Sequence, residues 1–279
     1  NIAFNKNIIL SLNYGQEQMT SYISWDQKFR NQIAYVSRVG ESAGKMYGFV
    51  YDGTYKEEDF NITVNENGKK TYELKPGVPK FKDGCQPGDP KYKNIDGSED
   101  NLITDNDRTV IGNGHPLHTG GFTNNFVYKN WDLNIFLQWS YGNDVFNVNR
   151  LVMENPGAKK QLNQFASYKN RWSESNPTSN IPRVRAVGAD EYSSLYVEDG
   201  SFLKLKTISL GYNFDTKTLK RIGLSAARVF VSAENIATIT GYSGSDPEVS
   251  TRHSVLTPGF DWSAYPRAFN ASLGVNVTF

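Results

Sequence analysis

The residues with the clearest capacity for chemistry are the carboxylates and amides between positions 94 and 107. Asp96, Asp100, Asp105 and Asp107 alternate there with Asn, Ser, Gly and apolar residues. Calcium prefers hard oxygen ligands of this kind, gathered on a loop that turns sharply at a glycine. The spacing departs from that of a regular EF-hand loop, so two interpretations stay open. These four aspartates form a calcium site, or they form a hydrated acidic turn. The sequence indicates no other cofactor.

A second set of candidates consists of aromatic side chains between the predicted strands. Aromatic rings are common in binding sites, where they stack on sugar rings and pack against peptide side chains. We predict substrate contacts from Tyr141, Trp172, Tyr196, Trp262 and Tyr265. The alternative is that these rings form small cores of the loops themselves.

The sequence lacks the patterns typical of covalent catalysis. It has one cysteine, three histidines, and neither a G-x-S-x-G motif nor a phosphate-binding glycine loop. His115 and His118 are spaced like metal ligands, but the glycine-rich segment around them favours two hydrated loop histidines. We therefore expect no enzymatic activity. The 30 Lys and Arg nearly balance the 29 Asp and Glu, which gives no electrostatic basis for nucleic-acid binding.

Stretches of alternating apolar and polar residues predict the elements that position these groups. In residues 268–279 every second side chain is apolar, from Phe269 to Phe279. The same period of two recurs in residues 131–141 and 207–214. Such alternation is typical of β-strands with one apolar and one polar face. Weaker alternation marks residues 2–14, 28–40, 119–129 and 226–239.

The predicted fold is all-β, an antiparallel transmembrane barrel segment of about seven long strands. Several strands reach the length that a tilted strand needs to cross a bilayer, about 9–11 residues. Aromatic residues near the strand ends, among them Trp131, Trp139 and Tyr141, resemble the girdles at the two lipid interfaces of a membrane barrel. The polar faces carry Asn, Thr, Ser and Gln, as expected of a water-filled lumen.

The connections between the predicted strands alternate between short and long. The long ones cover about residues 41–118, 142–200 and 240–266, and they hold most of the Gly, Pro and charged residues. Outer-membrane barrels combine short periplasmic turns with long extracellular loops. We therefore expect the three long loops on the extracellular side, with Phe279 at the periplasmic side. Because the chain begins inside an alternating segment, we also expect it to be a fragment of a longer protein.

Nine short motifs follow one another in an order and spacing that is specific to one family. They are Pro87–Lys93, Asp107–Asn113, Thr119–Phe126, Tyr141–Asn147, Val197–Lys206, Ile208–Tyr212, Ala233–Ile236, Thr240–Val249 and Tyr265–Arg267. Together they resemble the C-terminal part of the SusC/RagA family of TonB-dependent outer-membrane transporters, over about residues 40–279. The acidic loop is longer than is usual in the family and lacks its second glycine. Leu203-Lys204-Leu205 stands where the family has Leu-Arg-Leu, which keeps the charge.

The resemblance implies a fold, a location and a set of partners. Residues 1–279 would be the C-terminal portion of a 22-stranded barrel, with the plug domain absent from them. The transporter would lie in the outer membrane of a Gram-negative bacterium, surrounded by outer-membrane lipid. It would import nutrients, either oligosaccharides during polysaccharide utilisation or oligopeptides. A SusD-like surface lipoprotein would cover it, and TonB would act through the plug.

A different class of protein remains as the alternative. A secreted β-sandwich that binds carbohydrate through loop aromatics would also have alternating strands and long loops. In such a fold the apolar strand faces would pack against each other. The exposure of Leu273 and Val275 therefore distinguishes the two predictions.

Overall fold

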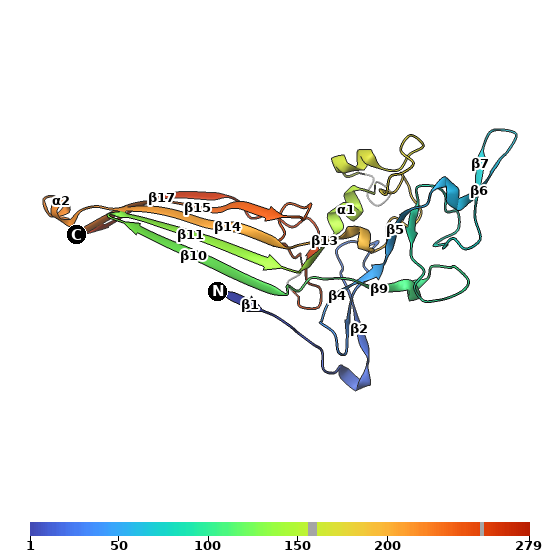
Figure 1. Cartoon of the computed structure of the whole chain (residues 1–279), viewed down its shortest axis with the longest axis horizontal. Coiled ribbons are helices and arrows are strands. Elements are labelled where there is room, and N and C mark those ends of the chain that lie inside the picture. The colour runs from blue at the N-terminus through green and yellow to red at the C-terminus, as the bar shows by residue number, and fades with distance from the viewer. Residues whose placement is uncertain (156–160, 252–253) are drawn as a thin grey trace.

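A long six-stranded sheet forms one end of an elongated molecule, and an assembly of loops forms the other (Figure 1). The computed structural model describes residues 1–155, 161–251 and 254–279. In spatial order the strands of the large sheet are β1 (Ile2–Phe4), β10 (His118–Tyr128), β11 (Trp131–Tyr141), β14 (Phe202–Asn213), β15 (Ala226–Thr240) and β17 (Asn270–Thr278). All neighbouring strands in this sheet run antiparallel.

Five of the strands expected from the alternation are present in this sheet. β10, β11 and β17 lie close to the predicted bounds, whereas β14 begins earlier, at Phe202, and β15 is the longest with 15 residues. The bounds agree well because a period of two over many residues permits only an extended chain with two unlike faces.

Two expected strands are wrong in length or in place. The segment 2–14 pairs with β10 only through β1, after which Ile9 exchanges backbone hydrogen bonds with Gly40 and Glu41. The segment 28–40 contributes only β3 (Ile33–Arg38), which belongs to a different sheet. Alternation shows that a segment is extended, but it does not show which neighbour the segment pairs with.

The loop assembly holds smaller sheets and short helices. Its four-stranded sheet has the order β2 (Gln18–Tyr22), β3, β4 (Lys45–Phe49) and β9 (Arg108–Asn113). The remaining strands are β5 (Tyr51–Thr54), β6 (Phe60–Val64), β7 (Lys70–Leu74), β8 (Pro90–Tyr92), β12 (Asp144–Asn147), β13 (Val197–Asp199) and β16 (Phe260–Asp261). The α-helix of this assembly is α1 (Val148–Met153), whereas a second described helix, α2 (Thr216–Lys220), lies between β14 and β15. Within the described ranges, no helix has the length and apolar character needed to pass through a membrane.

The short connections between the strands of the large sheet lie at one end of the sheet, and the long connections lie at the other. Residues 129–130 join β10 to β11, and the short segment with α2 joins β14 to β15. Both lie at the end of the sheet that also carries the C-terminus, far from the loop assembly (Figure 1). The long connections, residues 142–201 and 241–269, leave from the opposite end. The sheet therefore has the division into a short-turn end and a long-loop end that the sequence predicts.

The hydrophobic core lies in the loop assembly and not in the large sheet. Tyr35, Phe146, Tyr192 and Phe260 come from different long segments and are fully buried against one another. Among the described residues, Phe202 is the one buried hydrophobic side chain of the large sheet. The long loops therefore form a packed unit of their own, because distant apolar residues in them meet in space.

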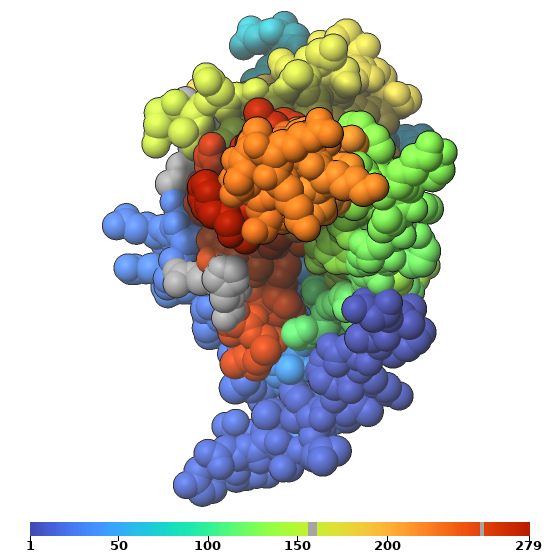
Figure 2. Space-filling view, turned by 90° about the vertical axis from the view of Figure 1, so that its left-hand side faces the viewer, coloured from blue at the N-terminus to red at the C-terminus, as the bar shows by residue number. Residues whose placement is uncertain are grey.

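The large sheet is curved, and the last long loop lies on its concave side. Viewed from the short-turn end, the sheet follows an arc from the green residues around the β10–β11 turn, past orange α2, to dark red β17 (Figure 2). Orange-red residues of the segment 241–269 lie below this arc. Hydrogen bonds from Lys204 of β14 to this segment agree with that placement.

Candidate functional site

The two faces of the large sheet differ in chemistry along their whole length. In register, Leu133, Leu210 and Val231 lie side by side, followed by Leu273 on β17. Leu273 is 76% exposed and Val275 61% exposed, so this apolar face has no protein layer over it in the described structure. A β-sandwich would bury these two side chains. The exposed face therefore contradicts the sandwich alternative.

The opposite face is polar and carries its own hydrogen bonds. Ser232 and Ser272 share a hydrogen bond of 2.7 Å between their hydroxyls, and the Asn134 amide donates to Asn125. Near the short-turn end, the Arg228 guanidinium forms an ion pair with Asp132. These cross-strand pairs satisfy polar groups on a concave surface without filling it with apolar side chains.

Aromatic rings on the polar face lie over glycines of the neighbouring strand. A Cβ at Gly274 would overlap the Phe230 ring, and one at Gly121 would come within 2.8 Å of the Phe136 ring. Each ring occupies the space above a glycine where the side chain of any other residue would lie. These glycines are therefore required for close approach and not for an unusual backbone angle.

A buried charge cluster joins the polar face to the last long loop. The Lys204 ammonium lies 3.3 Å from Asp246 and also binds Glu248. Arg267 pairs with Glu248 at 3.3 Å, and its backbone N–H donates to Asp246. Burial alone would raise the pKa of the Asp246 carboxyl, but backbone hydrogen bonds from Glu248 and Arg267 together with Lys204 hold it below its usual range. The cluster holds the loop against the concave face.

A second charged network joins two long loops to each other. The Arg150 guanidinium of α1 binds Glu154 and Glu198, both at 3.0 Å. Glu198 also accepts hydrogen bonds from the backbone and hydroxyl of Ser243. Burial would raise the pKa of Glu198, but these hydrogen bonds and Arg150 outweigh it and lower that pKa. The network therefore fixes the segment 241–269 to the segment 142–201.

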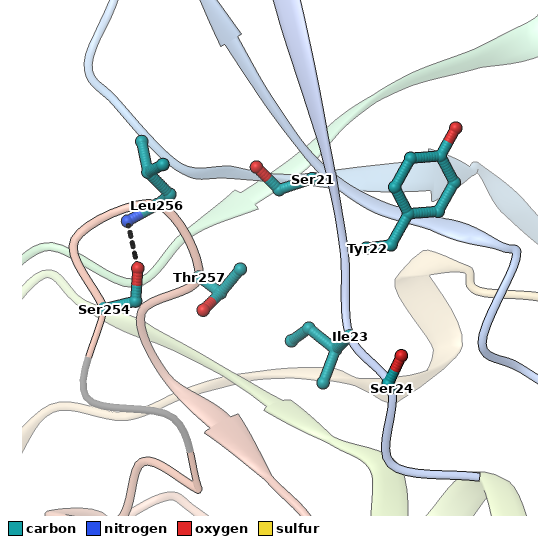
Figure 3. A pocket seen from close by; sticks show the side chains of 7 residues that line it. All are labelled: Ser21, Tyr22, Ile23, Ser24, Ser254, Leu256 and Thr257. Carbon is teal, nitrogen blue, oxygen red and sulfur yellow. Dashed lines mark hydrogen bonds between the residues drawn. The ribbon is translucent and has the colours of Figure 1, made fainter.

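One cavity lies between β2 and the last long loop. It has a volume of about 390 Å³ and is lined by hydroxyls, including Ser21, Ser254 and Thr257 (Figure 3). Across it, Ile23 supplies an apolar side chain, and the Ser254 hydroxyl accepts a hydrogen bond from the Leu256 backbone.

A second cavity of about 410 Å³ lies beside the four-stranded sheet. Tyr47 of β4 and Arg108 of β9 line it, together with Gln32 and Glu191. Its polar groups come from five separate stretches of the chain, which the fold brings together: residues 18–20, 31–33, 47, 105–108 and 191.

The five aromatic residues predicted to contact substrate lie in different surroundings. Tyr265 is 90% exposed, and Tyr141 is exposed at the end of β11, where it stacks on His118. Trp172 is half-buried against Gly88, and Trp262 packs on Trp25 at the edge of the core. The structure therefore does not bring the five rings together into one site.

Tyr196 requires a correction. We expected an exposed loop aromatic, but Tyr196 is 2% exposed and belongs to the core of the loop assembly. Its hydroxyl donates to the Ala189 carbonyl, and burial raises its pKa well above the ordinary value. The ring is unavailable to a ligand because it is buried in this core.

The four aspartates predicted to bind calcium each have a partner in the protein. Asp107 is fully buried and accepts hydrogen bonds from the backbones of Ile95, Asp96 and Thr104. Asp100 and Asp96 cap local turns, and Asp105 pairs with Arg108. No group of three or more metal-binding side chains occurs among the described residues. Calcium binding stays a prediction.

The two charged networks were missed by sequence reasoning. In the sequence, Glu198 stands out only as part of the motif Val197–Lys206, and Lys204 stands out only for its charge. A lysine within a long alternating strand is a signal that a carboxylate partner lies nearby if the strand is covered, since an unpaired buried charge is costly.

Known proteins resemble the chain along its full length. No protein-family model matches it. TonB-dependent receptor P3 of Formosa agariphila is 32% identical over 284 residues, which cover 100% of this chain and 26% of that receptor. TonB-dependent receptor SusC of Bacteroides thetaiotaomicron is 27% identical over 288 residues, which cover 100% of this chain and 24% of SusC.

The fold has a counterpart among solved structures. A chain of the RagAB peptide importer in its closed-closed state matches with a TM-score of 0.69 and 20% sequence identity. The match covers 100% of this chain and 26% of that one. The chain spans about a quarter of the length of the curated relatives it matches. The match of the whole chain to part of these receptors agrees with the two-faced sheet and the ordered motifs: the chain belongs to the SusC/RagA family of TonB-dependent receptors.

Proposed function

We propose that this chain forms part of the barrel wall and the extracellular loops of an outer-membrane importer of oligosaccharides or oligopeptides. Residues 1–279 are the C-terminal portion of that barrel in this proposal. The importer does not transform its substrate covalently. A SusD-like surface lipoprotein covers the loop assembly, and TonB drives import through the plug domain.

The exposed apolar face of the large sheet carries this proposal. Such a continuous apolar surface is unfavourable in water, whereas acyl chains of the outer membrane would cover it favourably. The concave polar face then borders the lumen. The long connections meet at one end of the strands, which fits an extracellular loop assembly. Among the predicted aromatics, Tyr265 and Tyr141 have the exposure that contact with a passing substrate requires.

The orientation of the sheet is testable in the intact receptor, reconstituted in lipid. Single cysteines at Leu273→Cys and Ser272→Cys, in a Cys85→Ala background, would carry an environment-sensitive fluorophore. Lipids brominated on their acyl chains quench the label at 273 and leave the matched label at 272 bright if β17 spans the bilayer. Equal quenching at both positions contradicts the proposal.

Transport itself needs a measurement in cells. Uptake of labelled oligosaccharides and oligopeptides is compared between the host bacterium and a strain without the receptor, each with and without a protonophore. The proposal expects uptake of one ligand class that depends on both the receptor and the proton gradient. Uptake of neither class would overturn it.

A further inference from the structure

We infer that the free edge of β7, in the hairpin of β6 and β7, is a docking edge to which an extended segment of the SusD-like lipoprotein adds as a further strand. This inference rests on the proposed function and locates its lipoprotein partner on this chain. In strand addition, hydrogen bonds between main chains supply the affinity, and contacts of alternate side chains supply the specificity.

The pairing within the hairpin determines which backbone groups β7 leaves free. The backbone N–H of Lys75 donates to the Asp59 carbonyl at 2.9 Å, so these two residues form a hydrogen-bonded pair. In an antiparallel pair of strands, hydrogen-bonded and non-hydrogen-bonded pairs alternate. Tyr72 and Leu74 therefore direct their backbone N–H and C=O groups away from β6. Within the described ranges, β7 pairs with no strand other than β6.

A groove of about 340 Å³ lies along this edge of β7. Residues 72–74 line it, together with Lys80, Lys82 and Cys85 of the following loop. Successive side chains of a strand point to opposite faces, so a groove that borders three successive residues lies at the strand's edge. Tyr72 and Leu74 also pack on the small core that contains Cys85, which holds the edge in place.

The hairpin lies at the outer limit of the loop assembly. It projects from the end of the molecule opposite to the short-turn end of the large sheet (Figure 1). If that sheet spans the membrane, the hairpin lies far out on the extracellular side. Its cyan residues lie above the arc of the sheet, on the side away from the last long loop (Figure 2). The remaining strands of the proposed barrel would close the arc on its concave side, so the lipoprotein cover is the neighbour that this edge meets.

The charges along the edge favour a segment with acidic side chains. Residues 65–85 hold five lysines and three carboxylates. Two of these lysines line the groove: Lys80 pairs with Asp83, and Lys82 pairs with Glu191 at 2.9 Å. Their side chains are nevertheless 41% and 46% exposed, and an ammonium has three N–H donors. Both can therefore bind a further carboxylate from a strand in the groove.

A second copy of this chain fits the same edge poorly. Antiparallel pairing of two β7 strands centred on Tyr72 would place Lys69 of one copy opposite Lys75 of the other. Pairing centred on Glu73 would place the two Glu73 carboxylates opposite each other. Like charges directly opposite one another destabilise a sheet, and lysines on edge strands protect them from pairing with copies of themselves. The edge therefore selects a different protein.

The test measures the affinity of the intact receptor for the purified SusD-like lipoprotein of its host. Tyr72→Pro removes an outward N–H of β7 without removing a hydrogen bond to β6, and it should weaken binding about 10-fold. Ile62→Pro is the matched control, because Ile62 lies opposite Tyr72 and its N–H points out from the other edge of the hairpin. Tyr72→Val loses the ring but keeps the N–H, and it should retain most of the affinity.

Hydrogen exchange of the complex gives a readout that is specific to strand addition. The backbone amides of Tyr72 and Leu74 should exchange at least 10-fold more slowly when the lipoprotein is bound. The amide of Ile62 should exchange at the same rate with and without it. A contact through side chains alone would not protect alternate amides of one strand.

The outcomes separate the docking edge from the proposed function. If the lipoprotein binds the unmodified receptor, Tyr72→Pro and Ile62→Pro equally well, the docking edge is wrong and the proposed function stands. Self-association of the receptor that Tyr72→Pro abolishes would show a second copy at the edge and overturn the inference. If the unmodified receptor does not bind the lipoprotein, the proposed partner is wrong and the docking edge with it. Heat-dependent mobility in detergent gels confirms that each variant is folded, and the opposed pair Lys70→Pro and Val64→Pro replaces the first pair if either member is not.

Discussion

Lys204 and Asp246 are 42 positions apart in the sequence, yet their side chains lie 3.3 Å apart on the concave face of the large sheet. Lys204 belongs to β14 and Asp246 to the last long loop. The contact also includes Glu248. It determines where that loop lies relative to the polar face.

Lys204→Met should release this loop. The change leaves two buried carboxylates near Lys204 without their main cation, which costs about 3–5 kcal/mol for a buried pair. We expect a lower thermal midpoint and faster proteolytic cleavage within residues 241–269 of the intact receptor. Lys206→Met is the control, since Lys206 lies 3.9 Å from Glu248 and is more exposed. Equal effects of the two variants would contradict the role of Lys204.

Acidification should loosen the same loop. Hydrogen bonds and cations lower the pKa values of Glu198 and Asp246 despite their burial. A carboxyl with a depressed folded-state pKa contributes stability above its unfolded-state pKa, about 4, and this stability is lost as the pH falls through the folded-state value. The protection of residues 241–249 against hydrogen exchange, relative to the intrinsic rate at each pH, should therefore fall below about pH 4. Glu198→Gln should flatten this dependence, and an unchanged profile in that variant would contradict the assignment.

Gly274→Ala should destabilise the last strand. The new methyl group would overlap the Phe230 ring, and overpacking of this kind costs about 1–3 kcal/mol. Gly241→Ala is a matched control, because a Cβ added there would meet nothing within 4 Å. Thermal unfolding in detergent measures both. The double variant Gly274→Ala, Phe230→Ala should show coupling between the two sites.

Substitution of Tyr196 should lower the stability of the protein strongly, whereas substitution of Tyr265 should leave it nearly unchanged. Tyr196→Ala removes a buried ring and should cost about 3–5 kcal/mol of stability. Tyr265→Ala changes an exposed ring and should alter stability by less than about 0.5 kcal/mol. If Tyr265 contacts substrate, its variant loses ligand affinity while the thermal midpoint stays constant. Unchanged affinity for every imported ligand would remove Tyr265 from the site.

The long strands could be predicted because the residues of each strand alternate between apolar and polar, as its two different surroundings require. In β17, apolar and polar side chains alternate without interruption, and only an extended chain between two unlike surroundings produces that pattern. The sorting of short and long connections also follows from the sequence, since antiparallel strands must alternate direction. The same reasoning failed for residues 2–14, which also alternate, because β10 pairs only with Ile2–Phe4 of that segment.

The sequence by itself determined the five long strands of the large sheet, their two faces and the family. Only the tertiary structure decided that Tyr196 is buried, that Lys204 meets Asp246, and that Gln32 and Arg108 share one cavity. The alternation of apolar and polar residues along a strand has a period of two, so neighbouring residues in the sequence are enough to reveal the strand. The partners of a loop side chain depend on how distant segments pack, and a sum of many weak contacts fixes that arrangement.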